Sequence, residues 1–248
     1  MRAIFVAGTD TNVGKTHVCG LLLDFMRKKG LAAGYQKWVA TGLESPPTDL
    51  VECLRMAGVP LEPELFNRQV LYHFALPASP HLAAEQAGAQ VDPELIRTRY
   101  QEMLTCYELL IVEGVGGLMV PLNRELLLVD LLCELKMPTL VVAKSGLGTI
   151  NHTLLTLEAL RHRDIHVLGL VFSDATSDED LMLVADNMRT IAEMGQVQVF
   201  GRLRHYPDPA QARLDFVPVG MAIAKALEVS DHRARHLLCY RPFRIPYV

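Results

Sequence analysis

The chain has 248 residues, half of them hydrophobic and 21% charged, which is enough to bury a large core in one α/β domain. Its formal net charge of -4 argues against broad electrostatic capture of nucleic acid or of an anionic membrane. The five cysteines lack CxxC pairing, which favours reduced thiols over a disulfide framework or a zinc site.

The N-terminal residues do not resemble a targeting segment. Residues 2–7 lead directly into a glycine turn, without a basic region, an apolar stretch and a cleavage site. No uninterrupted apolar run reaches the roughly 18 residues that a membrane-spanning helix needs. We therefore expect a cytoplasmic protein whose partners are small molecules or another protein, with neither nucleic acid nor membrane among them.

Short apolar runs alternate with segments of helical periodicity, and this alternation predicts a doubly wound, mainly parallel sheet flanked by helices. The runs that predict buried strands are residues 3–7, 109–112, 139–143 and 167–172. Apolar residues recur at helical spacing over 18–26 and 150–160, and residues 44–48 predict an exposed loop before a short helix. We expect a single domain over 1–248, with 230–248 as a possible C-terminal extension that is either a solvated tail or a docking segment.

The first strand leads into a glycine-rich loop that predicts phosphate binding. Residues 8–16 read Gly-Thr-Asp-Thr-Asn-Val-Gly-Lys-Thr, with a helix expected directly after them. Five residues separate Gly8 from Gly14, one more than in the usual signature, so the loop is a lengthened variant. The alternative is a glycine turn with an incidental Lys-Thr pair. The predicted nucleotide-binding residues are Gly8, Thr9, Asp10, Thr11, Asn12, Val13, Gly14, Lys15, Thr16 and His17.

Further charged residues are expected at the same edge of the sheet as this loop. Lys15 would neutralise the outer phosphates and the Thr16 hydroxyl would ligate Mg²⁺. Glu113 stands at the end of a buried strand and is a candidate Mg²⁺ ligand or water organiser; the alternative is a strand-end charge. Asp49, in Pro-Thr-Asp at 47–49, could supply a second carboxylate to the ion. Lys37 should emerge at the end of another strand, near Lys15 if that strand is parallel to the first; taken alone it reads as a surface residue.

In combination these motifs resemble the dethiobiotin synthetase family. The resemblance rests on residues 8–16, on Tyr-Gln-Lys at 35–37 with Thr-Gly at 41–42, and on Val-Glu-Gly-Val-Gly-Gly-Leu-Met-Val-Pro-Leu at 112–122. Ser-Pro-His at 79–81 and Gly-Leu-Gly-Thr-Ile-Asn-His at 146–152 resemble two further elements of the family. The resemblance spans roughly residues 1–205, and the ordered set is far more specific than a phosphate loop alone.

The resemblance implies a P-loop NTPase-like fold and a homodimer with the substrate at the subunit interface. It also implies ATP- and Mg²⁺-dependent carboxylation of 7,8-diaminononanoate with CO₂, giving dethiobiotin, ADP and phosphate. In such a reaction a substrate amine captures CO₂ as a carbamate, phosphorylation activates the carbamate, and the second amine closes the ureido ring.

The resemblance also implies roles for individual residues. Lys37, Lys15 and Thr11 would be catalytic, with Thr16, Asp49 and Glu113 holding Mg²⁺. The substrate-binding set would be Thr11, Lys37, Thr41, Pro80 and Gly117, together with Gly148, Thr149, Ile150 and Asn151 from the partner chain, which would hold the substrate carboxylate. The nucleotide base would meet Ser173, Leu203 and Arg204.

Some positions depart from the family pattern, and two rival functions remain. Ser173 stands where the family typically has Asn, and Arg204 where it has Pro; Ser173 has no amide that could donate and accept at adenine together, which leaves the base preference open.

One rival function is that of another P-loop amide-forming ligase, although such enzymes usually carry a glutaminase domain for which this length leaves no room. The other is a non-catalytic nucleotide switch or partitioning ATPase, which predicts a basic surface or an amphipathic targeting helix.

Overall fold

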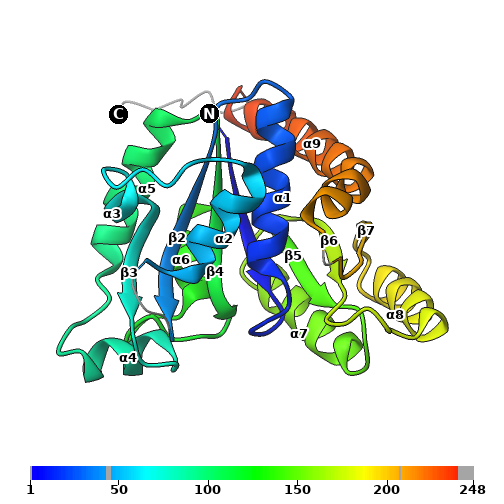
Figure 1. Ribbon diagram of the computed structural model, residues 1–248, viewed down its shortest axis with the longest axis horizontal. Helices are drawn as coiled ribbons and strands as arrows, with labels where there is room; N and C mark the ends of the chain where they lie inside the picture. Colours follow the sequence, from blue (N-terminus) through cyan, green and yellow to red (C-terminus); the bar gives the residue numbers. More distant parts are fainter. Residues whose placement is uncertain (1, 43–45, 207, 240–248) are drawn as a thin grey trace, which may run out of the picture.

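The computed structural model describes residues 2–42, 46–206 and 208–239. Within these residues the core is a seven-stranded sheet whose strands all pair in parallel, in the order β3-β2-β4-β1-β5-β6-β7 (Figure 1). The strands are β1 (Arg2–Gly8), β2 (Ala33–Thr41), β3 (Val70–Phe74), β4 (Leu109–Gly117), β5 (Thr139–Lys144), β6 (Val167–Ser173) and β7 (Val199–Leu203).

Helices cover both faces of this sheet. They are α1 (Lys15–Lys28), α2 (Thr48–Ala57), α3 (Phe66–Gln69), α4 (Pro80–Gln86), α5 (Pro93–Cys106), α6 (Leu128–Leu135), α7 (Thr149–Arg161), α8 (Leu181–Met194) and α9 (Pro209–Cys239). Buried residues of α1, α2 and α9 form one apolar cluster with the sheet, and those of α4 to α8 form another. In Figure 1 the first group lies in front of the sheet.

The strands are buried on both faces because their side chains alternate between these two clusters. In β1, Ile4 and Val6 join the cluster under α1, while Phe5 and Ala7 join the opposite one. This is why the strand sequences are almost continuously apolar instead of alternating. The prediction of a doubly wound parallel sheet is confirmed, and the four predicted strand cores lie inside β1, β4, β5 and β6.

Other boundaries differ from the prediction. Lys37 lies in the middle of β2 and Glu113 in the middle of β4, so the prediction that each stands at a strand end is wrong. The strands continue because the residues that follow, including Trp38 and Val39, still pack in the core. The short helix is α2, which begins at Thr48; residues 44 and 45 of the predicted loop lie outside the described residues.

The C-terminal part of the chain continues as helix. Helix α9 extends to Cys239 and therefore includes residues 230–239 of the predicted extension, while 240–248 lie outside the described residues. Within the described ranges, no helix combines the length and the apolarity required to cross a bilayer.

Candidate active site

The loop between β1 and α1 folds back on the side chain of Lys15. Lys15 Nζ donates a hydrogen bond to the Asp10 carbonyl at 3.0 Å, and the Asp10 carboxylate accepts one from the Thr11 N–H at 2.7 Å. A Cβ at Gly8 would lie 2.8 Å from the backbone carbonyl oxygen of Asp10, so the turn requires glycine there. Gly14 precedes α1 with a φ of 95°, which also favours glycine. The loop thus presents Lys15 and the positive end of α1 to one cavity.

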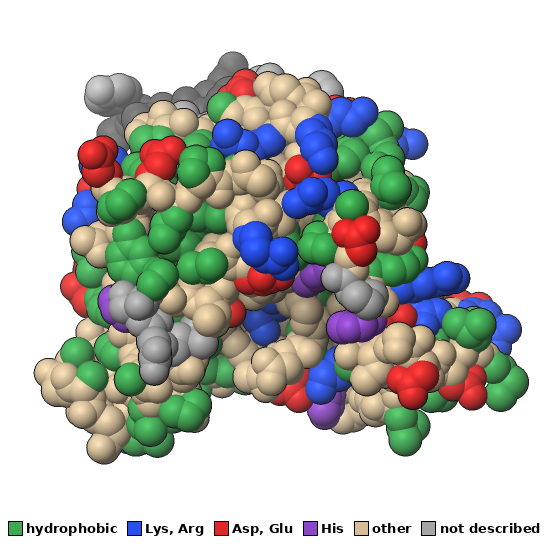
Figure 2. Space-filling model, viewed as in Figure 1, with side chains coloured by type: hydrophobic (Ala, Val, Ile, Leu, Met, Phe, Trp, Pro, Cys, Tyr) green, Lys and Arg blue, Asp and Glu red, His purple; other side chains and the backbone are tan. Residues whose placement is uncertain are grey.

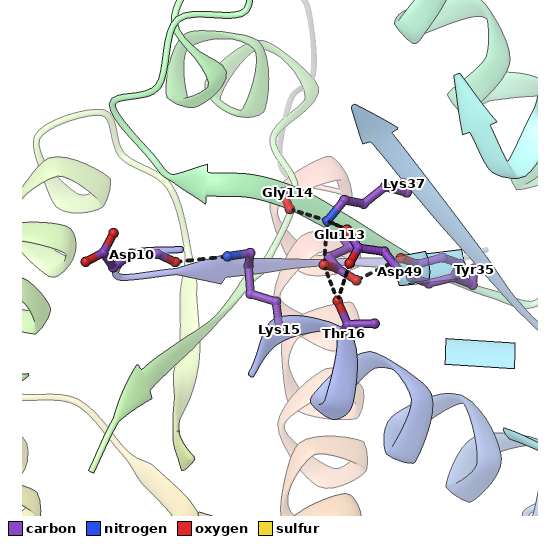
Figure 3. Close-up of polar contacts among 8 residues, drawn as sticks. All are labelled: Asp10, Lys15, Thr16, Tyr35, Lys37, Asp49, Glu113 and Gly114. Carbon is purple, nitrogen blue, oxygen red and sulfur yellow. Dashed lines mark hydrogen bonds and ion pairs between the residues drawn. The ribbon is translucent and has the colours of Figure 1, made fainter. Parts of the chain in front are cut away.

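Glu113 is the buried centre of the charged cluster, with only 1% of its surface exposed. Its Oε1 accepts from Lys37 Nζ at 2.6 Å and from Thr16 Oγ1 at 2.9 Å, and its Oε2 accepts from the Tyr35 hydroxyl at 2.7 Å (Figure 3). Asp49 approaches from α2, with Oδ1 3.4 Å from Thr16 Oγ1. Two neighbouring strands, β2 and β4, and two helices that flank them therefore converge on one carboxylate pair.

Lys37 bridges the two carboxylates. Its Nζ lies 2.7 Å from Asp49 Oδ2, 2.6 Å from Glu113 Oε1 and 3.2 Å from the Gly114 carbonyl, which uses all three of its protons. The pairing register of β2 with β4 places Lys37 directly beside Glu113. Burial opposes the charged form of Lys37, but Glu113 and Asp49 outweigh it and raise the pKa of the ammonium, which stays charged.

Lys15 has the opposite electrostatic balance. Burial, reinforced by the nearby positive charge of Lys37, lowers the pKa of Lys15 to about 8, although Glu113 and Asp49 partly oppose this. Lys15 and Lys37 line the same cavity, and two buried ammonium groups there repel each other unless anions lie between them. Such a pair is suited to a polyanionic ligand, because the ligand relieves the repulsion.

A cavity of about 660 Å³ opens above this cluster and is lined by Lys15, Thr16, Lys37, Asp49 and Glu113. Thr11 and Thr41 line it as well. Figure 2 shows a hollow on this face with Lys or Arg and Asp or Glu side chains in it and histidines along one rim. The structure therefore brings the residues predicted for phosphate, metal and reacting groups into one space.

A second cavity of about 560 Å³ adjoins the first through Asn12, Gly14 and His17, which line both. Ser173, at the end of β6, and Arg204 line it too, whereas Leu203 is buried at the end of β7. Because this cavity opens from the phosphate loop, it lies where the nucleoside part of a bound nucleotide would extend.

Other predicted residues do not line the 660 Å³ cavity of their own chain. Gly148 precedes α7 with a φ of 86°, and Thr149, Ile150 and Asn151 form the first turn of that helix. Pro80 is the first residue of α4, and Gly117 lines a third cavity, of about 320 Å³, together with Thr9 and His152. None of these six residues is among those that line the 660 Å³ cavity.

Thr16, Asp49 and Glu113 fit a hard divalent cation. They offer two carboxylates and one hydroxyl, all oxygen donors, at the edge of a polar cavity that has room for water ligands. Within the described part of the chain, no group of three or more His, Cys, Asp and Glu side chains is placed to hold a metal ion. The donor set therefore suits Mg²⁺, which keeps several waters and is completed by substrate phosphates, better than Zn²⁺.

Tyr35, Glu52 and Lys144 also lie at these sites, although the sequence alone predicted no role for them. Tyr35 is fully buried and bonded to Glu113, Glu52 lines both cavities, and Lys144 ends β5 at the second cavity. A signal for Tyr35 was present, because it stands two residues before Lys37 on the same strand and must face the same side of the sheet. Lys144 was signalled by its position after the buried run 139–143.

Comparison with solved structures identifies the fold. MinD, the cell division protein of Aquifex aeolicus, superposes with a TM-score of 0.54 at 14% identity, over all of both chains. Apo McdA of Cyanthece gives a TM-score of 0.54 at 12% identity, over 92% of this chain and 99% of that one. At this level of identity the likeness concerns the arrangement of strands and helices alone.

Comparison of sequences identifies the family. A family model described as an AAA domain matches residues 2–213. The ATP-dependent dethiobiotin synthetase BioD of Rhodopseudomonas palustris strain TIE-1 is 40% identical over 92% of this chain and 95% of its own. The BioD proteins of Sphingopyxis alaskensis and Methanocaldococcus jannaschii are 36% and 34% identical, over 94% and 83% of this chain and 100% and 95% of theirs. The chain therefore belongs to the family of ATP-dependent dethiobiotin synthetases.

Proposed function

We propose that the chain is an Mg²⁺- and ATP-dependent dethiobiotin synthetase that converts 7,8-diaminononanoate and CO₂ to dethiobiotin. The observation that carries the proposal is the convergence of Lys15, Lys37 and the Glu113–Asp49 pair on one cavity at the phosphate loop. The relatives named above bear this activity in their names and match most of the chain.

The nucleotide would span the two adjoining cavities. Its triphosphate would lie on the loop at residues 8–16, where Lys15 and the N-terminus of α1 attract anions, and its base would enter the cavity lined by Ser173 and Arg204. Asn12, Gly14 and His17 line both spaces and would flank the connecting sugar and phosphates.

The proposed carboxylation requires no covalent bond between the enzyme and an intermediate. One substrate amine adds to CO₂ to give a carbamate and releases a proton. A carbamate oxygen attacks the γ-phosphorus, ADP leaves, and a carbamoyl-phosphate anhydride forms. The second amine then attacks the carbonyl carbon, the C–O bond to phosphate breaks, and the ureido ring closes with loss of a second proton.

Lys37 would hold the carbamate against the γ-phosphate. All three of its protons are engaged with Glu113, Asp49 and the Gly114 carbonyl, so contact with a carbamate requires that at least one of these bonds be released. Lys15 would hold the phosphate side of the same pair of anions. Two fixed cations next to the transferring group stabilise its charge and align it for in-line attack.

Thr16, Asp49 and Glu113 would hold Mg²⁺. When bound there, the ion would screen the repulsion between phosphate oxygens and carbamate and would take over the carboxylate charge that Lys37 now neutralises. Oxygen donors on three different elements give the site its fixed shape.

Thiol chemistry is not part of the proposal. Cys19 and Cys53 lie in the helices next to the charged cluster, but burial, together with the charge of Glu113, raises the pKa of both thiols well above the ordinary value. Both therefore stay protonated, and neither is placed as a nucleophile.

The diamine carboxylate would be held by a second copy of the chain. Gly148, Thr149, Ile150 and Asn151 lie at the start of α7, outside the cavity of their own subunit. In a homodimer the N-terminus of this helix would face the partner's cavity and attract the carboxylate. Each site would then draw on two chains.

The direct test is an assay of the purified chain with diamine, bicarbonate, Mg²⁺ and each nucleoside triphosphate in turn, with product identified by mass. Formation of dethiobiotin with equimolar phosphate release is expected. Phosphate release without dethiobiotin would contradict the proposal, and retention of activity with metal chelated would contradict the role of Mg²⁺. A comparison of kcat/KM among the triphosphates also measures the base preference that Ser173 and Arg204 leave open.

A further inference from the structure

Tyr35 contributes a contact to the charged cluster that no other residue of β2 duplicates. Its hydroxyl donates to Glu113 Oε2 at 2.7 Å, while Lys37, two residues further along, takes Oε1 of the same carboxylate (Figure 3). The β2–β4 register pairs Tyr35 with Ile111 and Lys37 with Glu113, so strand alternation places both side chains on the face covered by α1.

The two oxygens of Glu113 therefore have different roles. Oε1 faces the cavity cluster, where it meets both Lys37 and Thr16, and Oε2 is directed toward Tyr35. A carboxylate with one oxygen fixed cannot turn freely about its last bond. Tyr35 thereby determines which oxygen Glu113 presents to the cavity.

The Tyr35 contact can persist through the reaction, whereas the contacts of Lys37 and Thr16 change. In the proposed cycle Lys37 turns to the carbamate, and the Thr16 hydroxyl turns to the metal. The ring of Tyr35 is fully buried in the apolar cluster between the sheet and α1, so packing fixes its hydroxyl in place. Once Lys37 and Thr16 have turned away, the hydroxyl of Tyr35 still holds Glu113.

We infer that Tyr35 is a positioning residue that aims Glu113 at the divalent cation and thereby sets the affinity of the cation site. The inference rests on the proposed role of Glu113 as an Mg²⁺ ligand. Partners that orient a metal ligand typically change metal affinity or activity by about 10–100-fold when removed. A buried tyrosine that only filled space would lack this effect.

The test compares Tyr35→Phe with Tyr100→Phe, because both variants delete one hydroxyl from a buried ring. Tyr100 is 5% exposed in α5 and packs in the cluster on the opposite face of the sheet. The probe is Mn²⁺ in the presence of ADP, with free Mn²⁺ measured by electron paramagnetic resonance. Tyr35→Phe should bind Mn²⁺ about 10–100-fold more weakly, and Tyr100→Phe should match the unmodified chain.

The Mg²⁺ dependence of turnover gives a second measurement. With Tyr35→Phe the Mg²⁺ concentration for half-maximal rate should rise by the same factor, and kcat should recover at saturating Mg²⁺. A general distortion of the site would instead lower kcat at every Mg²⁺ concentration. That result, or an unchanged Mn²⁺ affinity in Tyr35→Phe, would overturn the inference.

Glu113→Gln separates this inference from the function on which it rests. If Glu113→Gln binds Mn²⁺ normally, the proposed metal role of Glu113 fails and the positioning role fails with it. If Glu113→Gln is impaired and Tyr35→Phe is not, only the positioning role fails. The double variant Tyr35→Phe/Glu113→Gln should be no weaker than Glu113→Gln alone; a further loss would show that Tyr35 acts by another route. The double variant leaves a neutral amide, and not a buried carboxylate, without the Tyr35 donor, so this comparison is available even if Tyr35→Phe does not fold by itself.

Discussion

At the scale of single residues, the ammonium of Lys37 is expected to act on chemistry more than on nucleotide binding. It lies among carboxylates, beyond the loop that would hold the triphosphate. Lys37→Ala should lower kcat by at least about 10²–10³-fold, the loss typical of one charge-stabilising donor. Its affinity for ATP, measured by calorimetry in the absence of diamine, should stay within a few-fold of the unmodified chain.

Lys28→Ala is the matched control for Lys37→Ala. Lys28 is 65% exposed at the end of α1 and pairs with Asp24 four residues earlier, so its removal should leave turnover unchanged. The thermal unfolding of both variants should also be measured, because Lys37→Ala leaves the Glu113 carboxylate buried without its counter-ion and can lower stability. Equal losses of kcat and ATP affinity in Lys37→Ala would mean that Lys37 binds the nucleotide instead of aligning the carbamate.

The hydroxyl of Thr16 offers a second test at this scale. It lies between Glu113 Oε1 and Asp49 Oδ1, at 2.9 and 3.4 Å, where a metal ligand is expected. Thr16→Val keeps the shape of the side chain and removes the oxygen. We expect the Mg²⁺ requirement for turnover to rise by about 10-fold or more, while Thr105→Val, whose hydroxyl bonds to the Glu102 carbonyl within α5, changes it little. An unchanged Mg²⁺ titration in Thr16→Val would exclude the hydroxyl from the metal site.

The sequence predicted the types of residue in this site better than their contacts. Lys15, Thr16, Asp49 and Glu113 belong to motifs whose chemistry can be read from residue type and spacing. The bridge from Lys37 to both carboxylates and the bond from Tyr35 depend on the register between β2 and β4, which are more than 60 residues apart. A one-residue change of register would turn Tyr35 and Lys37 to the opposite face, and a single sequence contains no measure of register.

At the scale of elements, the predictable strands are those whose burial makes them continuously apolar. The strands β1, β4, β5 and β6 have this character, and their cores were predicted. The edge strands β3 and β7 were not, because burial is incomplete there; β3 is buried only at Val70 and Phe74. The predicted ends of β2 and β4 came too early. Lys37 and Glu113 are charged, and a charged residue after an apolar run suggests that the strand has ended; only the structure shows that the two form a buried pair.

The contact between α9 and α1 gives a testable prediction for an element. A Cβ at Gly220 in α9 would lie 2.6 Å from the ring of Phe25 in α1, so the helices approach closely at this point. Gly220→Leu should lower the free energy of unfolding by about 1–3 kcal/mol, the usual effect of overpacking. Leucine is a better helix former than glycine, so any loss comes from packing.

The control for Gly220→Leu is the neighbouring substitution Met221→Leu. Met221 is 50% exposed, and its replacement should change stability by less than about 0.5 kcal/mol. Chemical denaturation of both variants measures the difference. If Gly220→Leu proved as stable as the unmodified chain, α9 would not be held against α1 in the way described.

At the scale of the whole molecule, the first turn of α7 contains predicted substrate-binding residues that do not line the active-site cavity of their own chain. The residues at 148–151 match a family motif, yet they do not line the cavity that contains Lys37. A helix N-terminus placed on the outside of a subunit suits an anion carried by a ligand of the neighbouring subunit. In the proposed homodimer, which the resemblance to the family implies, each site would combine Lys37 of one chain with Asn151 of the other.

Mixing two inactive variants tests this shared site. Lys37→Ala and Asn151→Ala should each lose most of the activity as homodimers, because every site lacks one contributor. In a mixed dimer one site lacks both residues and the other has both intact. Random exchange after dilution or mild denaturant should therefore restore about a quarter of the normal rate, since half of the dimers are mixed and each has one complete site. If both residues served a site within one chain, no mixed dimer would contain a complete site, and the rate would not rise above that of the separate variants. A monomeric mass by light scattering under assay conditions would likewise contradict the shared site.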